Sequence, residues 1–191
     1  MTRLTLVRHG QTDWNLERRY QGQKDIPLNS EGVRQAQALA QLLAAEPYDA
    51  IYSSDLQRAM QTAQALQAAR SIPLYADPRL REICFGEWEG EIFQVMREKY
   101  SERFTLSHSD PTIILACGGE SVSQVAARTA AFADEVSRIF PEGRLLVVTH
   151  GMALATLVCQ ANGLPLTEAH NMVPENAKPV DISWPAVIKQ T

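Results

Sequence analysis

Apolar and polar residues follow one another in blocks along this chain, and the spacing inside each block predicts the element that it forms. Two strongly apolar runs, Leu4–Val7 and Arg144–Thr149, predict short buried strands. A shorter run within Tyr48–Tyr52 predicts a third strand, and weak alternation over residues 180–188 predicts a last one. These runs lie far apart in the sequence, so their pairing has to be long-range.

Helical periodicity fills the segments between the strands. Apolar residues recur three and four positions apart, which predicts helices over Glu31–Ala45, Leu56–Ala69, Glu91–Tyr100, Ser121–Phe140 and Met152–Asn162. Ser30 and Asp55 are the expected N-caps of the first two helices. Pro47 is expected to stop the first helix, and Gly163 with Pro165 to end the last.

Strands that alternate with helices favour an α/β protein with a mostly parallel sheet and helices on both faces. Residues 22–29 and 73–88 are expected to be loops because Gly and Pro punctuate them. Residues 101–119 are also expected to be irregular. The chain has 191 residues and no long repeat or linker, so residues 1–191 are expected to form one domain.

Two strands end in the same way. Leu6–Gly10 reads LVRHG and Val147–Gly151 reads VVTHG, so each apolar run is followed by His-Gly. Ligands of α/β sheets bind at the carboxyl ends of the strands. If the two strands are neighbours, His9 and His150 point into one crevice.

The residue types near these strand ends suit chemistry on a phosphoryl group. Arginine offers a planar fork of donors to phosphate oxygens. A neutral imidazole can attack phosphorus and carry the group covalently, and a carboxylic acid can protonate the leaving oxygen. The candidates that could converge on such a group are Arg8, His9, Arg58, Glu82 and His150, with Asn15 as a neutral donor.

The residues alone leave plainer interpretations open. Arg58 lies on a polar helix face, where an arginine is usually a solvated charge, and Asn15 is as easily a turn residue. The acid could also come from the neighbours of Glu82, which are Glu87, Glu89 and Glu91.

A metal site is a further alternative for the same side chains. His9, His150 and Glu82 are possible metal ligands. The cations Arg8 and Arg58 argue against this alternative because they would repel a metal ion. Activity in excess chelator would separate the two interpretations.

The composition narrows the class of partner and the compartment. The net charge is −4 and no run of basic residues occurs, which argues against a nucleic-acid or membrane surface. The longest apolar stretch, Leu145–Cys159, is interrupted by polar residues and is too short to span a bilayer. The apolar run before Arg8 is too short for a signal peptide. The cysteines form no CxxC pair, so a reducing cytoplasm is expected; they are Cys84, Cys117 and Cys159.

The ordered series of motifs resembles the histidine phosphatase superfamily, in its phosphoglycerate mutase-like branch. Residues 6–15 match the signature of a strand followed by RHG, [EQ]T, W and N, and the resemblance covers roughly residues 3–160. Further matches are Arg19–Gly22, Asp25, Pro27–Asn29, Glu31–Gly32, Ser53–Ala59, Leu80–Glu82, Phe85–Gly90, Gly118–Ser121 and Val148–Gly151. RHG alone is a weak signal, whereas the series in this order is very specific.

The resemblance implies a three-layer α/β/α sandwich with a mostly parallel central sheet, and chemistry without a metal or other cofactor. It makes His9 the nucleophile that becomes phosphohistidine, and Glu82 the proton donor and later the base. The residues implied to hold the phosphoryl oxygens are Arg8, Arg58, His150 and Asn15. The residues expected to border the substrate are Gln21, Gly22 and Gly151.

The family contains both phosphatases and mutases. Mutase-type members follow the acid with Arg-His-Tyr-Gly, whereas Glu82 is followed here by Ile83-Cys84-Phe85-Gly86. Segment 91–117, the expected substrate cap, has Arg97, Lys99 and Arg103 as its cations, and no role is assigned to Cys84.

These differences favour a phosphomonoester hydrolase for a small phosphorylated metabolite, of the sugar phosphate, phosphoserine or α-ribazole phosphate type. The alternatives are a phosphoglycerate mutase and, from another class, a catalytically weak module that binds a phosphorylated ligand.

Overall fold

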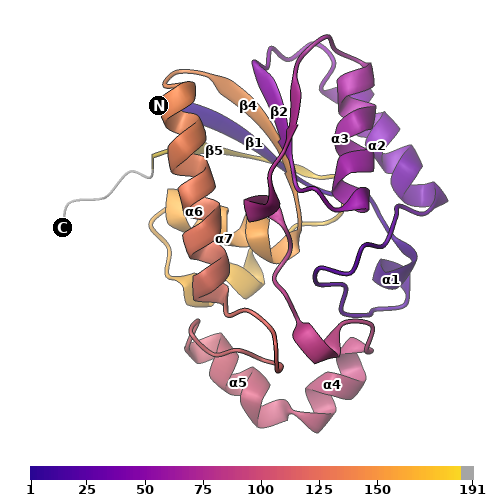
Figure 1. Ribbon diagram of the computed structural model, residues 1–191, viewed down its shortest axis with the longest axis vertical. Helices are drawn as coiled ribbons and strands as arrows, with labels where there is room; N and C mark the ends of the chain where they lie inside the picture. Colours follow the sequence, from indigo (N-terminus) through magenta and orange to yellow (C-terminus); the bar gives the residue numbers. More distant parts are fainter. Residues whose placement is uncertain (186–191) are drawn as a thin grey trace.

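A five-stranded sheet forms the centre of the computed structural model, which describes residues 1–185 (Figure 1). Its spatial order is β3-β2-β4-β1-β5. The bounds are β1 (Thr2–Arg8), β2 (Ala50–Ser53), β3 (Leu74–Ala76), β4 (Arg144–Thr149) and β5 (Pro179–Trp184). Neighbouring strands pair in parallel, except that β5 runs antiparallel to β1. The mostly parallel sheet is confirmed, and residues 186–188 of the predicted last strand lie outside the described residues.

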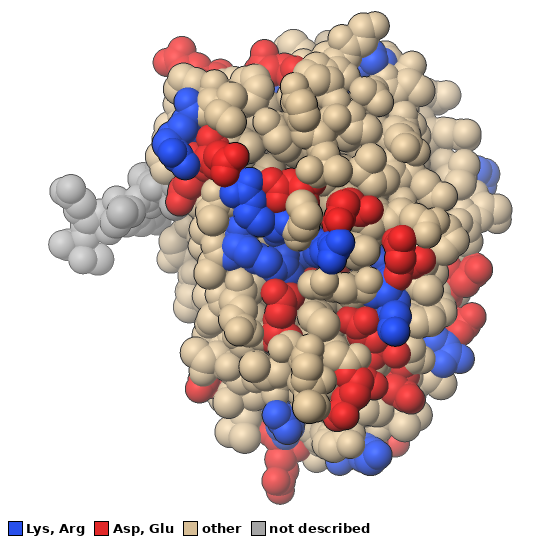
Figure 2. All heavy atoms as spheres, in the orientation of Figure 1, with Lys and Arg blue, Asp and Glu red and all other residues tan. Residues whose placement is uncertain are grey.

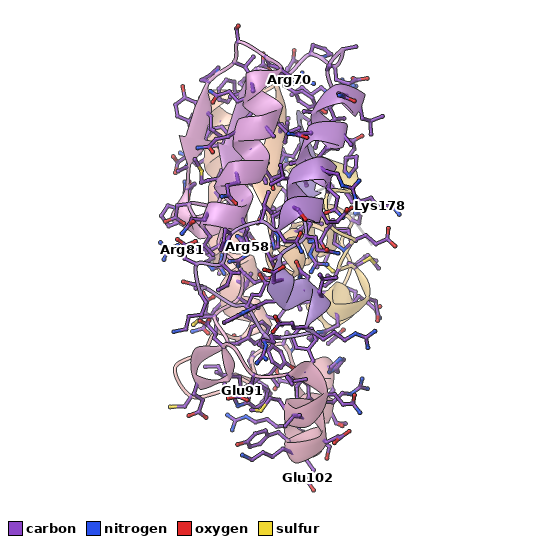
Figure 3. The ribbon with its side chains drawn as sticks, turned by 90° about the vertical axis from the view of Figure 1, so that its right-hand side faces the viewer. Arg58, Arg70, Arg81, Glu91, Glu102 and Lys178 are labelled. Atoms are coloured by element: carbon purple, nitrogen blue, oxygen red, sulfur yellow. The ribbon has the colours of Figure 1, made fainter. Side chains whose placement is uncertain are left out.

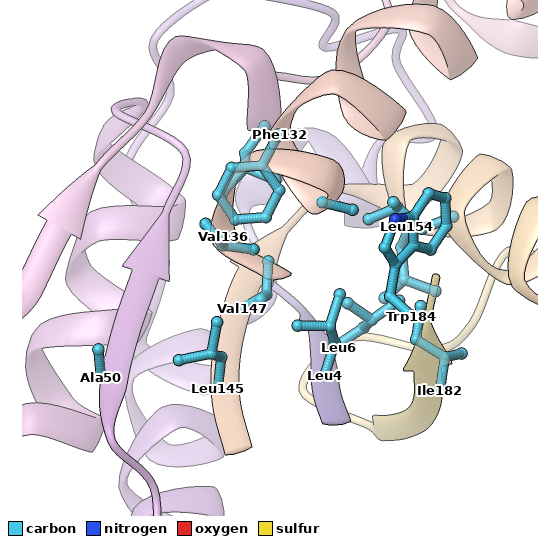
Figure 4. Packing of buried hydrophobic residues seen from close by; sticks show 13 residues of the cluster. Leu4, Leu6, Ala50, Phe132, Val136, Leu145, Val147, Leu154, Ile182 and Trp184 are labelled. Carbon is cyan, nitrogen blue, oxygen red and sulfur yellow. The ribbon is translucent and has the colours of Figure 1, made fainter. Parts of the chain in front are cut away.

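Helices cover both faces of the sheet, as predicted (Figure 1). The helices of the first face are α2 (Ser30–Leu42) and α3 (Gln57–Ala68), and those of the second are α6 (Val122–Ile139) and α7 (Gly151–Ala161). In β1, Leu4 and Leu6 pack toward α6 and α7 (Figure 4), whereas Val7 packs toward α2 and α3. Because both faces of the strands are buried, the three-layer α/β/α sandwich is confirmed.

The shorter elements gather beyond the carboxyl ends of the strands. They are α1 (Asp13–Leu16), η1 (Pro78–Leu80), η2 (Gly86–Trp88), α4 (Phe93–Lys99), α5 (Ser101–Ser109) and η3 (Leu166–Asn171). Figure 1 shows α4 and α5 together at one end of the molecule, away from the layers of the sandwich. An aromatic cluster holds them: Trp88 stacks on Tyr100 with ring centroids 4.9 Å apart, and lies 5.4 Å from the ring of Phe104.

The expectation that residues 101–119 are irregular is wrong, because Ser101–Ser109 form α5. No side chain caps this helix, and its stability comes from tertiary contacts such as that of Phe104 with Trp88. Residues 73–88 likewise contain β3, a three-residue edge strand that pairs with β2 through Leu74 and Ile51. Both elements depend on partners distant in sequence.

The caps of two helices differ from the prediction. Asn29, rather than Ser30, caps α2, and its side chain accepts a hydrogen bond from Gly32 N at 2.9 Å. Asp55 does not cap α3, because its carboxylate accepts two hydrogen bonds from Arg81 at 2.7 and 2.5 Å.

Asp25 satisfies the first turn of α3 instead. Its Oδ1 accepts a hydrogen bond from Gln57 N at 2.7 Å, and its Oδ2 accepts one from the Gln57 side chain at 3.0 Å. The cap therefore comes from the loop that precedes α2. No local sequence pattern predicts this contact.

Charged side chains of both signs lie next to one another across the middle of the face shown in Figure 2. On this face η1 and α6 are joined by an ion pair of Arg79 with Glu135 at 2.8 Å. Among the helices of residues 1–185, none has the length and apolarity needed to cross a membrane.

Candidate active site

The two strands that end in His-Gly are neighbours, which brings both histidines together. Arg8 of β1 pairs with Thr149 of β4, and His9 N donates to Thr149 O at 2.9 Å. The imidazole rings of His9 and His150 have their centroids 5.0 Å apart. The expected crevice at the carboxyl edge of the sheet is therefore present.

His9 is held as a neutral imidazole whose Nε2 carries no proton. Its Nδ1 lies 2.7 Å from Gly10 O, so Nδ1 carries the proton and donates it to that carbonyl. Burial first, and then the cations Arg58 and Arg8, lower the pKa of His9 well below 6.5. The Nε2 lone pair is thus available near neutral pH, and Arg58 Nε donates to it at 3.3 Å.

Arg58 is a buried cation rather than a solvated one. Its side chain stands in the first turn of α3 (Figure 3) and the residue is 0 % exposed. Nη1 donates to Lys24 O and Nη2 to Gly22 O, each at 2.7 Å. Burial lowers the pKa of Arg58 to about 10, so the group stays charged near neutral pH. The solvated interpretation of Arg58 is wrong.

Arg8 and His150 each keep one buried nitrogen without a partner among the described residues. Arg8 Nη1 donates to Pro174 O at 2.8 Å, while Arg8 Nε has no acceptor. His150 Nε2 lies 2.8 Å from Ser54 Oγ, while Nδ1 is unpartnered. If Ser54 donates to Nε2, Nδ1 carries a hydrogen. Buried polar groups are nearly always paired, so these nitrogens mark where ligand oxygens fit.

Glu82 lies at the N-terminus of α7, across the same crevice. Its Oε1 accepts from Ile83 N at 2.9 Å and from Met152 N at 3.0 Å. A Cβ at Gly151 would be in ordinary contact with Glu82 Oε2 at 3.4 Å but would lie only 2.9 Å from Val173 Cγ1, so the glycine makes room for Val173. The carboxylate is therefore fixed before any substrate arrives.

The backbone of Glu82 is held from behind by Arg128 of α6. Nη2 of Arg128 donates to Glu82 O at 3.0 Å, and Nη1 donates to Arg81 O at 2.6 Å and to Arg79 O at 2.7 Å. Glu120 pairs with the same guanidinium at 3.0 Å. No sequence pattern singled out Arg128, since its role depends on η1 packing against α6.

The other carboxylates of this segment are engaged elsewhere. Glu89 Oε1 accepts from Gln23 N at 2.8 Å and from Phe85 N at 3.1 Å. Glu87 and Glu91 border a separate hollow. Of the four candidate acids, Glu82 is the one that lines the pocket containing His9.

That pocket has a volume of about 270 Å³. The predicted site residues that line it are Arg8, His9, Asn15, Gln21, Gly22, Arg58 and Glu82. His150 and Gly151 lie behind this lining, next to His9 and Glu82 respectively. The lining residues that were not predicted are Trp14, Arg18, Arg19, Phe85, Phe93 and Asn176.

The predicted neutral residues of the pocket are Asn15, Gln21 and Gly22. Asn15 Oδ1 accepts from Thr12 N at 3.0 Å in a capping box, which leaves its amide hydrogens for a ligand. Gln21 Oε1 is buried without a partner in the described part of the chain. Gly22 has φ 50°, and a Cβ there would lie 2.0 Å from Glu89 Oε1.

Asn176 also lines the pocket, although no sequence pattern predicts it. Its Nδ2 donates to His9 O at 2.8 Å and lies 3.5 Å from Asn15 Oδ1. A lone asparagine in a polar loop carries no periodic or motif signal, so only the fold identifies it. Trp14, in contrast, stood inside the signature motif and could have been named.

A metal site is not supported by the geometry. Within residues 1–185, no group of three or more His, Cys, Asp and Glu side chains is arranged to hold a metal ion. The positive charges of Arg58 and Arg8 both help to lower the pKa of His9, so the surroundings of His9 favour an anion over a cation.

Comparisons with known proteins agree with this chemistry. The sequence profile of the histidine phosphatase superfamily (branch 1) matches residues 4–185. Phosphoserine phosphatase 1 of Hydrogenobacter thermophilus is 34% identical over 177 residues, which is 93% of this chain and 84% of that protein. A protein named "Probable phosphoglycerate mutase GpmB", from Proteus mirabilis, is 39% identical over 166 residues, which is 86% of this chain and 77% of that protein.

A solved structure is similar to this chain in both fold and sequence. The mycobacterial glucosyl-3-phosphoglycerate phosphatase, solved with VO3, aligns with a TM-score of 0.88 at 33% identity. The alignment covers 95% of this chain and 90% of the other.

Proposed function

The chain belongs to the histidine phosphatase superfamily, branch 1, and is a phosphoric monoester hydrolase of small metabolites; we propose that His9 is its nucleophile. The observation that carries this assignment is the neutral His9, whose Nε2 lone pair faces a pocket lined by the cations Arg8 and Arg58. A nucleophile and an anion site are thus built at one strand end.

In the first step, His9 Nε2 attacks phosphorus, and the bond from phosphorus to the leaving oxygen breaks. Arg58, Arg8 Nε and His150 Nδ1 bind the equatorial oxygens, on which the transition state spreads its charge. Asn15 adds a neutral donor. Glu82 gives its proton to the leaving oxygen, so that an alcohol departs and a phosphohistidine remains.

In the second step, the Glu82 carboxylate takes a proton from water as the water oxygen attacks phosphorus. The bond to Nε2 breaks, inorganic phosphate leaves, and His9 returns to its neutral form. Throughout, the hydrogen bond from Nδ1 to Gly10 O keeps the ring in one orientation and one tautomer. No step needs a metal ion or another cofactor.

We also propose that residues 91–117 cap this pocket, within a single domain formed by residues 1–191. Phe93, which begins α4, supports the cap because it lines the pocket opposite the sheet. Cys84, Cys117 and Cys159 are free thiols, in keeping with a reducing cytoplasm.

Phosphate release tests the proposal against the mutase alternative. The enzyme is given phosphoserine, sugar phosphates, α-ribazole phosphate and 3-phosphoglycerate, with excess chelator throughout, and free phosphate and isomerised product are both measured. Release of phosphate with kcat/KM well above background for at least one substrate is expected. Conversion of 3-phosphoglycerate to its isomer with negligible phosphate release would contradict hydrolysis, and binding without turnover would point to a binding module.

A further inference from the structure

A second cavity opens beside the catalytic pocket. It has a volume of about 620 Å³, against about 270 Å³ for the pocket that contains His9. Arg18 and Phe93 line both spaces, so the two are neighbours that meet at these residues. A substrate whose phosphoryl group lies at His9 has room for its leaving group here.

Arg18 stands at this junction in a strained conformation. Its φ is 53°, in the left-handed region that residues with a side chain rarely adopt. The backbone is pinned there, because Arg18 N donates to Asn15 O at 3.3 Å and Arg18 O accepts from Phe93 N at 2.9 Å. Strain of this kind is a recurrent sign of a functional position.

The second cavity has an excess of positive charge. Arg18 and Arg97 both border it, and neither forms an ion pair with any carboxylate in the described part of the chain. Glu17 is the acidic residue of the lining, and Arg19 already neutralises it in an ion pair. Two unpaired guanidiniums facing one hollow are unusual in a chain with a net charge of −4.

The walls of the same cavity are apolar. Tyr20 and Phe93 meet edge to face with ring centroids 4.3 Å apart, and Ile92 and Phe104 complete the lining. Phe93 remains 45% exposed although it is a large hydrophobic side chain. An exposed aromatic next to unpaired cations is an environment that binds an apolar skeleton bearing an anion.

We propose that the second cavity is a leaving-group subsite, in which Arg18 and Arg97 bind a second anionic group of the substrate while its skeleton packs on Phe93. The inference rests on the proposed phosphatase function and specifies its substrate class. The preferred substrates are phosphomonoesters whose leaving group carries a carboxylate or a second phosphoryl group on an apolar or planar frame.

Matched aryl phosphates test the subsite. Phosphate release is measured for 4-carboxyphenyl phosphate and for its neutral isostere, 4-carbamoylphenyl phosphate, so that the reacting group stays the same. The 4-(phosphonomethyl)phenyl analogue asks whether a phosphoryl-type anion is preferred to a carboxylate. The wild-type enzyme is expected to favour the anionic substrates by roughly tenfold in kcat/KM, the size of one charge-assisted hydrogen bond. The preference is expected to shrink as salt is raised.

Substitutions then assign the preference to this cavity. Arg18→Asn is the first variant, because asparagine tolerates a positive φ and so does not add strain. It is expected to bring the anionic-to-neutral ratio close to one, and Arg97→Gln to lower the ratio in the same direction. Arg138→Gln, which removes an exposed arginine from α6, is the matched control and should keep the wild-type ratio.

The outcomes separate the subsite from the function on which it rests. Phosphate release without an anionic preference, or an unchanged ratio in Arg18→Asn, overturns the subsite alone. An equal loss of preference in Arg138→Gln also overturns it, since net charge would then be the cause. No phosphate release from the three esters, with release from at least one of the phosphorylated metabolites tested above, also overturns the subsite alone. No release from any substrate of either set overturns the phosphatase function.

Discussion

The two sides of the catalytic pocket are built in different ways. On the side of the sheet, Arg58 and His150 are 0% exposed and each makes a hydrogen bond inside the protein. On the side of α1 and α4, Arg18 and Phe93 are exposed and come from short segments. Groups that are buried and hydrogen-bonded are preorganised for one reaction, whereas exposed ones set which leaving group is accepted.

His9→Ala is expected to show the largest effect of the sheet side. Loss of the nucleophile should lower kcat by at least about a thousandfold for every substrate, because no other group can form the intermediate. Steady-state kinetics with an alkyl and an aryl phosphate measure this. The variant should bind vanadate or phosphate less tightly but stay folded by circular dichroism. A thousandfold loss of kcat for one substrate, with little loss for the other, would contradict the proposed difference between the two sides of the pocket.

Arg58→Ala comes next. Removing a buried donor to the transferring phosphoryl group should lower kcat/KM roughly a hundred- to thousandfold, again for all substrates alike. Arg58→Lys should recover little, since one ammonium cannot bond both Gly22 O and Lys24 O and also reach the substrate. The exposed Arg34→Ala serves as the control and should retain wild-type kinetics.

Glu82→Gln should distinguish substrates by their leaving group. An alkoxide leaves poorly without a proton, whereas p-nitrophenolate is stable as an anion. Phosphorylation by an alkyl phosphate should therefore slow by roughly a hundredfold more than phosphorylation by p-nitrophenyl phosphate. Pre-steady-state rates of both reactions decide it. A larger differential in Glu87→Gln or Glu89→Gln than in Glu82→Gln would assign the acid to that residue instead.

Phe93→Ala examines the exposed side. We expect KM to rise about fivefold for substrates with apolar leaving groups, which is in the range of one lost aromatic contact. For substrates with small polar leaving groups, KM should change little. The thermal midpoint should hardly move because Phe93 is 45% exposed. Val95→Ala on the same helix is the control. A uniform loss over all substrates would mean that Phe93 supports the reacting group rather than the leaving group.

The dependence of stability on pH belongs mainly to the sheet side. Burial lowers the pKa of both His9 and His150 well below 6.5, so below pH 6.5 the unfolded chain binds protons that the folded chain does not. Stability is full above pH 6.5 and falls with decreasing pH, by about 1.4 kcal/mol per pH unit for each histidine. Urea unfolding between pH 5.5 and 7.5 measures the slope.

His9→Gln should reduce that slope, since one of the two groups is removed. The exposed His108→Gln is the comparison variant. Because His108 stacks on His170 with ring centroids 4.1 Å apart and helps burial to lower the pKa of His170, a smaller reduction of the slope is expected in this variant than in His9→Gln. A slope that is the same in His9→Gln and the wild type would show that the histidines at the strand ends are not the cause.

Local patterns predicted the layers of the fold and the centre of the site. The apolar strands ending in His9 and His150, and the helical repeats between them, are signals within about twenty residues of sequence. They were sufficient to expect a mostly parallel sheet, and both histidines at one edge on the condition that the two strands are neighbours. Burial on both faces places β1 and β4 inside the sheet, and the structure shows that they pair with each other.

The parts that were not predicted depend on contacts across the sequence. Asp25 caps α3 from another loop, α5 is held by Phe104 against Trp88, and Asn176 reaches His9 from the far end of the chain. The strained Arg18 and its pairing with Phe93 belong to the same class. No residue type or spacing in the sequence predicts such contacts. The residues on the leaving-group side of the pocket could therefore be identified only from the structure.

Transfer of the phosphoryl group through His9 is tested by trapping the phosphohistidine intermediate. Glu82→Gln is mixed with p-nitrophenyl phosphate, because this leaving group departs without an acid while hydrolysis of the intermediate lacks its base. The reaction is quenched in alkali, where phosphohistidine survives, and the modified residue is located by mass spectrometry. The account predicts a burst of p-nitrophenolate matched by one phosphoryl group on His9. A phosphoryl group on any other residue, or continued turnover with no protein-bound phosphate, would contradict it.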